Sequence, residues 1–226
     1  DDPLFNVRFG WGNASGTIRW NRQLSPKLFL NQSLIFSDYK YNISNQLELF
    51  GIELFSSVRD YGYKADLDFL PSPKHTIKMG VMYTYHILQP GGFEGNTADS
   101  SFQTRSENQL FGNEAGIYIQ DDWDISDRVK INYGFRASAF VTPDTQYVVP
   151  EPRISGRYKI NDDLSAKLSY SRMSQFLHLV SNSSVSLPTD LWFPSTRRLR
   201  PQISDQIAAG IAQGLFDNKV TFTAEG

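Results

Sequence analysis

The sequence contains no cysteine, which excludes disulfide bonds and metal sites built on thiolates. It also lacks any apolar run of the length that a transmembrane helix needs. A net charge of -2 leaves no excess of basic residues of the kind that nucleic-acid-binding domains concentrate on one face. The signatures of nucleophile-elbow hydrolases, P-loop proteins and zinc metalloproteases are absent as well. The sequence therefore predicts neither an enzyme nor a nucleic-acid-binding protein.

What the sequence does contain is long period-two alternation, clearest between residues 129 and 141. The odd positions are apolar or aromatic: Val129, Ile131, Tyr133, Phe135, Ala137, Ala139 and Val141. The even positions are mostly polar or small: Lys130, Asn132, Gly134, Arg136 and Ser138. This pattern indicates a β-strand with one apolar and one polar face. At about thirteen residues it is longer than the usual strand of a soluble protein.

The preceding stretch alternates in the same way, and a tight turn at Ser126 and Asp127 joins the two runs into a hairpin. Its apolar face carries Ile117, Ile119 and Trp123, and its polar face carries Tyr118, Gln120, Asp122 and Asp124. A tilted strand crosses a bilayer in about nine to eleven residues. The hairpin is therefore predicted to face lipid on one side and a water-filled lumen on the other.

Similar strands are predicted along the rest of the chain, separated by segments rich in glycine, proline, asparagine and aspartate. The predicted turns and loops lie at residues 12–15, 24–26, 42–45, 70–74, 89–109, 126–127, 142–149, 161–163, 177–200 and 216–218. Gly51 is predicted to mark a bulge. Short connections alternate with longer ones, and two of the longer ones run to about twenty residues, which is typical of outer-membrane barrels.

The predicted fold class is therefore all-β, an antiparallel transmembrane β-barrel. About eleven strands are expected, roughly half of a 22-stranded barrel. A half barrel would leave two unpaired strand edges, which a bilayer does not tolerate. Residues 1–226 are accordingly expected to be a partial barrel domain within a longer chain.

Three stretches resemble a known family. The segments YIQDDWDISDRVKINYGFR and EPRISGRYKINDDLSAKLSYSR are similar to the barrel of TonB-dependent outer-membrane receptors. Upstream, GWGNASGTIRWNRQLSPKLFLNQSLIFSDYKY resembles the carboxypeptidase-regulatory-domain subgroup found in the Bacteroidota. The similarity runs from about Gly10 to the end of the sequence.

The resemblance implies active uptake across the bacterial outer membrane of an iron chelate, cobalamin, a glycan or a peptide. It implies outer-membrane lipid and the TonB–ExbB–ExbD complex as partners, and part of the family also has a surface lipoprotein lid. TonB would act through a plug, and the plug, an amino-terminal domain and the carboxy-terminal strands are expected outside residues 1–226. No covalent chemistry and no cofactor are implied.

Candidate ligand contacts lie in the predicted long loops. Trp192, Phe193, Arg197 and Arg198 combine aromatic faces with guanidinium groups, which stack on sugars and pair with carboxylates or phosphates. Phe93 and Phe102 are weaker candidates in the other long loop. The simpler interpretation of both sets is packing of the loops onto their neighbours.

A basic stripe is predicted on the lumenal face, formed by Lys130, Arg136, Arg153, Arg157, Lys159 and Lys167. These groups are expected to pair with acidic groups of a plug or of the wall itself. No metal site is predicted: the acidic side chains of residues 121–124 alternate between faces, and the three histidines lie on separate elements. His86 is expected to face the lumen, and Trp123 to sit in an aromatic girdle.

Two alternatives remain open. A passive, porin-like channel would share the alternation and the loop asymmetry but would have no plug. A soluble all-β binding or structural protein would explain the strands without a membrane, and it would fold as these 226 residues alone.

Overall fold

The computed structural model describes residues 6–47, 50–97, 103–106, 108–180, 191–216 and 219–226. These residues form thirteen strands and no helix. The strands are β1 (Asn6–Ser25), β2 (Leu28–Leu47), β3 (Phe50–Ser72), β4 (His75–Thr97), β5 (Gln103–Ser106), β6 (Leu110–Asp124), β7 (Val129–Val141), β8 (Gln146–Lys159), β9 (Leu164–Gln175), β10 (Leu177–Val180), β11 (Leu191–Pro194), β12 (Gln202–Leu215) and β13 (Val220–Glu225). In this part of the chain, no helix is long and apolar enough to cross a membrane.

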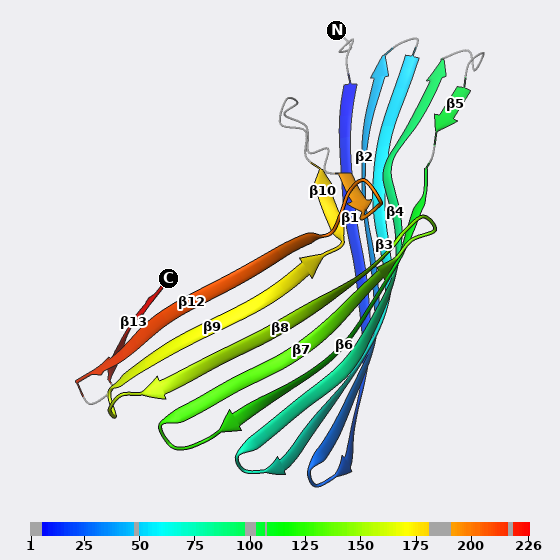
Figure 1. Cartoon of the computed structure of the whole chain (residues 1–226). Helices are drawn as coiled ribbons and strands as arrows, with labels where there is room; N and C mark the ends of the chain where they lie inside the picture. Colours follow the sequence, from blue (N-terminus) through cyan, green and yellow to red (C-terminus); the bar gives the residue numbers. More distant parts are fainter. Residues whose placement is uncertain (1–5, 48–49, 98–102, 107, 181–190, 217–218) are drawn as a thin grey trace.

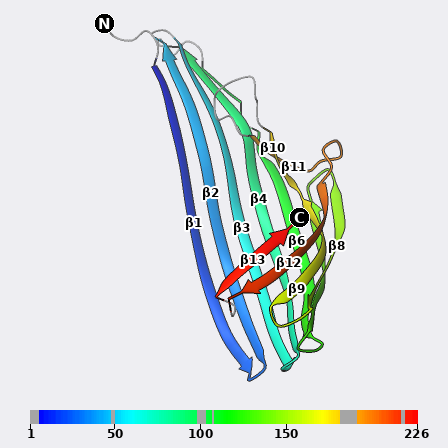
Figure 2. The same ribbon diagram turned by 90° about the vertical axis from the view of Figure 1, so that its left-hand side faces the viewer.

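Eleven strands form one antiparallel sheet, in the order β1-β2-β3-β4-β6-β7-β8-β9-β12-β13 with β5 beside β4. β10 and β11 form a separate two-stranded sheet. Each strand of the main path pairs with the next along the chain, apart from these short inserted strands, so the sheet is a meander. The ribbon is strongly twisted and curved (Figures 1 and 2). The predicted all-β antiparallel class and strand number are confirmed.

The sheet has an apolar face and a polar face, as the alternation predicts. On the apolar face large side chains are widely exposed: Ile117 by 61%, Leu168 by 61% and Ile207 by 74%. A soluble protein does not leave such a contiguous apolar surface uncovered. The polar face carries Arg136, Glu151 and their neighbours. The sheet therefore suits lipid on one side and water on the other.

The predicted central hairpin is confirmed: β6 and β7 pair from Asn113 with Val141 to Asp124 with Lys130. Ser126 and Val129 close the turn through reciprocal backbone hydrogen bonds of 3.2 Å. The turn at 161–163 also forms, because the Asn161 side chain accepts the backbone N–H groups of Asp163 and Leu164. Part of the predicted turn at 216–218 lies outside the described residues.

Two predicted turns are wrong. β1 runs without interruption through residues 12–15, and β2 runs through residues 42–45. Their paired register continues from Asn6 opposite Gln46 down to Gln23 opposite Phe29. Glycine, asparagine and serine favour turns locally, but an unbroken ladder of backbone hydrogen bonds between the two strands outweighs that preference.

The predictions around Gly51 and residues 89–109 also need correction. Gly51 pairs regularly with Gln46, and the register shift of β3 lies between Phe55 and Ser57 instead. The segment predicted as a loop at 89–109 continues β4 to Thr97 and forms β5, which folds back onto β4. Likewise β8 begins within the predicted 142–149 loop, at Gln146.

The two halves of the sheet differ in height. β1–β4, the tall half, contain 20 to 23 residues each. β6–β9 and β12, the short half, contain 12 to 15 residues each. In Figure 1 the tall strands extend well beyond the ends of the short ones, and β10 and β11 lie beside that extension. β11 contacts β4 and β6.

Candidate functional site

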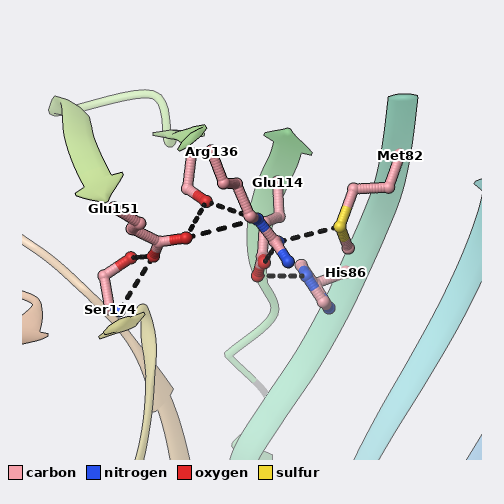
Figure 3. Close-up of polar contacts among 7 residues, drawn as sticks. Met82, His86, Glu114, Arg136, Glu151 and Ser174 are labelled. Carbon is pink, nitrogen blue, oxygen red and sulfur yellow. Dashed lines mark hydrogen bonds and ion pairs between the residues drawn. The ribbon is translucent and has the colours of Figure 1, made fainter. Parts of the chain in front are cut away.

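A continuous row of polar contacts crosses the polar face of six neighbouring strands (Figure 3). We call this row the polar belt. Its members are Asp60 on β3, His86 and Met82 on β4, Glu114 on β6, Arg136 and Ser138 on β7, Glu151 on β8 and Ser174 on β9. Alternation places the members on β3 to β8 on this face, and the sheet register places neighbours at contact distance. Ser174 has the same parity as Tyr170 on the apolar face, and it reaches Glu151 because the β8–β9 ladder ends at Ser171.

His86 lies at one end of the belt between two carboxylates. Its Nδ1 is 2.8 Å from Asp60 Oδ1, and its Nε2 is 3.6 Å from Glu114 Oε2. The residue is only 5% exposed. A buried imidazole between two carboxylates forms a bridge from β3 through β4 to β6. The prediction that His86 faces the lumenal side agrees with this position.

Arg136 forms the centre of the belt. Its Nε donates to Ser138 Oγ at 2.9 Å and lies 3.3 Å from Glu151 Oε2, while Nη2 lies 4.0 Å from Glu114 Oε1. Nη2 also lies 2.8 Å from the Met82 sulfur. A guanidinium group presents its donors in a rigid planar fork, so one residue can contact several acceptors on both sides. Arg136 thereby links β4, β6 and β8 through β7.

Glu151 completes the belt and is only 8% exposed. Its Oε2 accepts the Ser138 hydroxyl at 3.0 Å, and its Oε1 accepts the backbone N–H of Ser174 at 2.8 Å. The Ser174 hydroxyl donates to the same Oε1 atom. A buried carboxylate is tolerated only when charge and hydrogen bonds compensate its lost hydration. Here Arg136 supplies the charge and the three donors supply the hydrogen bonds.

The predicted basic stripe does not act as one unit. Arg136 belongs to the belt, and Lys130 forms an ion pair of 2.7 Å with Asp124. Arg157 is different, because its Nε is buried and has no hydrogen-bond partner in the part of the chain that the structure describes. Arg157 pairs in register with Lys130 on one side and Lys167 on the other. All three line a groove of about 700 Å³ toward the short-turn end of the sheet.

The residues predicted to contact a ligand in the long loops do not form one common surface. Trp192 and Phe193 are consecutive in β11, opposite Leu179 and His178, so their side chains alternate between faces. Arg197 and Arg198 are exposed, and the Arg197 Nε donates to the Asp144 carbonyl oxygen at 2.8 Å. Phe93 lies in β4, opposite Leu54 and Ser106. Phe102 lies outside the described residues.

The acidic segment at 121–124 is divided between the two faces of the sheet. On the apolar face Asp121 contacts His75 Nδ1 at 2.7 Å and accepts the Tyr133 hydroxyl at 3.1 Å. Trp123 stacks on the His75 ring, with centroids 5.5 Å apart. Among the described residues, no group of three acidic or histidine side chains is arranged to hold a metal ion.

Sequence reasoning placed Arg136 correctly on the polar face but missed its partners. Glu114 was detectable, since it follows the same alternation as Tyr118 and Gln120. The contact from Glu151 to Ser174 was not, because it depends on where the end of β9 leaves the sheet.

Known proteins share this fold. The sequence profile of the family described as TonB dependent receptor-like, beta-barrel matches residues 2–226. Among curated proteins, no sequence matches significantly. Similar solved structures include the copper transporter OprC, with a TM-score of 0.70, 10% identity and 91% of this chain covered. Another is the RagAB peptide importer in its closed-closed state, with a TM-score of 0.61, 12% identity and 98% of this chain covered.

A further similar structure is BauA, the ferric preacinetobactin receptor of Acinetobacter baumannii, with a TM-score of 0.58, 13% identity and 93% of this chain covered. Identities this low show a shared fold only. The chain spans about a third of each relative: 30% of the RagAB chain and 36% of the OprC and BauA chains.

Proposed function

The chain belongs to the TonB-dependent receptor β-barrel family, and on that basis we propose that it forms part of the wall of an outer-membrane receptor for TonB-energised nutrient uptake. The observation that carries this proposal is the two-faced sheet. Its apolar face exposes side chains such as Ile117 and Ile207, and its polar face carries a buried network of charges. A membrane barrel requires both features in the same strands.

The proposed ligand is an iron chelate, cobalamin, a glycan or a peptide. The names of the similar structures include a peptide importer, a ferric preacinetobactin receptor and a copper transporter, so the fold accommodates chemically different cargo. Trp192, Phe193 and Arg198 are the proposed ligand contacts of the long connection, with Phe93 and Phe102 as secondary contacts. Because Arg197 binds the Asp144 carbonyl, we assign it first to holding the loop.

The proposed partners follow from family membership. The remainder of the receptor would supply a plug, further strands and an amino-terminal domain, and the TonB–ExbB–ExbD complex would act through the plug. The groove containing Lys130, Arg157 and Lys167 is the proposed plug-facing surface, because the Arg157 Nε there lacks an acceptor among the described residues. The Gly10–Tyr41 segment supports the Bacteroidota-type subgroup, and with it a surface lipoprotein lid.

The experiment that tests this proposal compares three strains: wild type, one lacking the receptor gene and one lacking TonB. Each strain is grown with ferric siderophores, cyanocobalamin, oligosaccharides or peptides as the sole source of iron, cobalamin, carbon or nitrogen. Loss of growth on one class in both deletion strains is expected. Receptor-dependent growth that survives the loss of TonB would instead show a passive channel.

A further inference from the structure

Beyond Ser171, β9 separates from β8 but stays paired with β12, and the chain after β9 folds over the polar face. The β8–β9 ladder ends where Arg153 pairs with Ser171, whereas the β9–β12 ladder continues to Gln175 opposite Gln202. Beyond this point β8 pairs only with β7. We call the described residues that follow, 174–180 and 191–199, the inward arm.

Aromatic packing fastens the base of the inward arm. Phe176, 2% exposed, stacks on Phe140 of β7, 0% exposed, with centroids 5.1 Å apart and planes inclined by 5°. Val149 of β8 completes this buried cluster. The Tyr147 hydroxyl donates to the Thr196 carbonyl oxygen at 2.7 Å. The arm is thus joined to β7 and β8 by both apolar and polar contacts.

The buried Ser195, which follows β11, connects the arm to Phe176 at its base and to His178 of β10. Ser195 is fully buried; its N–H and its hydroxyl both donate to the Phe176 carbonyl oxygen, at 2.7 and 2.9 Å. His178 Nε2 lies 2.9 Å from Ser195 Oγ. At the far side, Leu191 Cδ2 lies 3.9 Å from where a Cβ on Gly91 of β4 would stand. The arm therefore reaches from β8 across to β4.

Glu151 connects the arm to the polar belt. The backbone N–H of Ser174 has no β8 partner in the ladder, and it donates to Glu151 instead. The Ser174 hydroxyl donates to the same carboxylate, which Arg136 and Ser138 hold from the other side. Glu151 is the point where the departing strand end meets the charged wall (Figure 3).

We propose that Glu151 is the positioning residue that holds the inward arm against β4 and β6, and that the arm is a fixed partition of the lumen rather than a lid. This inference rests on the proposed receptor function. The arm would occupy the upper polar face of β4 and β6, so a ligand would pass along the rest of the wall. Arg136 and Ser138 would support Glu151 in this role.

Burial argues for a fixed element. Segments that open during function are drawn from regions with few buried contacts. The described side chains exposed by less than 2% are Leu88, Ser138, Phe140 and Ser195. Ser195 belongs to the arm itself, Phe140 stacks on its base, and Ser138 bonds to Glu151. The best-packed part of the described sheet is thus the junction of the arm with the wall.

Hydrogen–deuterium exchange of the full-length receptor tests the role of Glu151 without any ligand. Glu151→Gln and Ser174→Ala should each accelerate exchange in peptides covering 174–180 and 191–199 about tenfold, the effect of losing a charge-assisted hydrogen bond. Asp124→Asn is the matched control, because it removes a carboxylate that pairs with Lys130 far from the arm. Equal exchange in Glu151→Gln and wild type, or rapid arm exchange in the wild type, would overturn the proposal.

Cross-linking tests whether the arm stays in place. The described chain has no cysteine, so Gly91→Cys with Leu191→Cys adds one thiol pair across the arm–β4 contact. Cross-linking in cells with a short bifunctional thiol reagent, which tolerates a wider Cβ–Cβ separation than a direct disulfide, should proceed at the same rate with and without a protonophore that abolishes TonB energisation. Slower cross-linking in energised cells would identify a lid. No cross-link under either condition would show that the arm is not docked.

These readouts separate the two proposals. Exchange and cross-linking report the position of the arm whatever the receptor transports. If the arm behaves as a fixed partition but no TonB-dependent growth is found, only the proposed function fails.

Discussion

The tall and short halves of the sheet share one band of apolar side chains and differ beyond it. In both halves apolar side chains alternate outward, from Ile77 to Tyr85 on β4 and from Val129 to Val141 on β7. Above that band the tall strands continue as sheet, with Asp38 and Arg59 paired at 3.2 Å on the outward face. The short strands end, and the chain after β9 folds inward. The apolar band is common to both halves. The residues beyond the band continue as sheet in the tall half and fold over the polar face in the short half.

The difference shows where stability is concentrated. Above the band, the tall half holds its residues mainly by backbone ladders, by partly exposed polar pairs such as Asp38 with Arg59, and by a buried hydrogen bond of 2.9 Å from the Ser56 hydroxyl to the Gln89 carbonyl oxygen. The short half ends in the buried stack of Phe140 on Phe176 and the compensated carboxylate of Glu151. Removing side chains should therefore harm the two halves unequally.

The largest expected effect comes from the buried stack. Phe140→Ala should weaken docking of the inward arm by about 3–5 kcal/mol, because it removes a fully buried ring and leaves a cavity. Phe36→Ala in the tall half, which loses only the tilted contact with Tyr61, should cost about 1 kcal/mol. Limited trypsin digestion at Arg197 and Arg198, with thermal unfolding of the full receptor, measures both. Equal losses would remove the distinction between the halves.

The second prediction compares an arginine placed inside the common apolar band with one placed beyond it. Ile117→Arg, on the apolar face of β6, should destabilise the receptor in lipid by about 2–4 kcal/mol, since a charge near the bilayer centre is poorly solvated. Ala14→Arg, opposite Asp38 on the tall extension, should cost at most about 1 kcal/mol. Urea unfolding in phospholipid vesicles compares the two variants. A similar cost at both positions would place the tall extension inside the bilayer.

The third prediction concerns pH and the inward arm. Burial lowers the pKa of His178, so the docked arm favours the neutral ring. Docking should be strongest above the ordinary histidine pKa of about 6.5 and should weaken as pH falls below it toward the lower pKa of the docked state. Exchange of the arm should therefore accelerate in acid relative to its intrinsic pH dependence, while β1–β3 should not respond.

His178→Gln is the control for this pH effect. Its amide can donate to Ser195 as the imidazole Nε2 does, but it does not titrate. The acid-induced acceleration should disappear in this variant. Its persistence would assign the effect to another group.

The smallest effect is expected from the surface pair of the tall half. Asp38→Asn should cost about 0.2–1 kcal/mol, because the Arg59 side chain is 46% exposed and water screens the attraction. Increasing salt should reduce the difference between Asp38→Asn and wild type in thermal unfolding. A larger cost, comparable with that of Phe140→Ala, would show that the tall half depends on buried polar contacts too.

Several features of the molecule could be predicted from the sequence because they are local. Successive side chains of a strand point to opposite faces, so Val129–Val141 specifies its two faces without reference to any partner. The turns at Ser126 and Asn161 depend on hydrogen bonds over two or three residues. The family resemblance rested on the same strands and was confirmed by the match over residues 2–226.

The wrong predictions of turns and loops have a different origin. Residues 12–15 and 42–45 carry turn-forming side chains, yet they lie in strands because β1 and β2 pair along their whole length. Local preference was overridden there by a ladder whose register depends on the neighbouring strand. The continuation of β4 to Thr97 was missed for the same reason.

The sequence by itself thus determined the two faces of the strands and the short turns, since each depends on neighbours along the chain. Only the tertiary structure decided that the tall strands continue as sheet beyond the apolar band, while the chain after β9 folds over the polar face. That choice depends on contacts between separate strands, such as Phe140 with Phe176 and Glu151 with Ser174. No local pattern encodes them, because their partners meet only when the sheet has assembled.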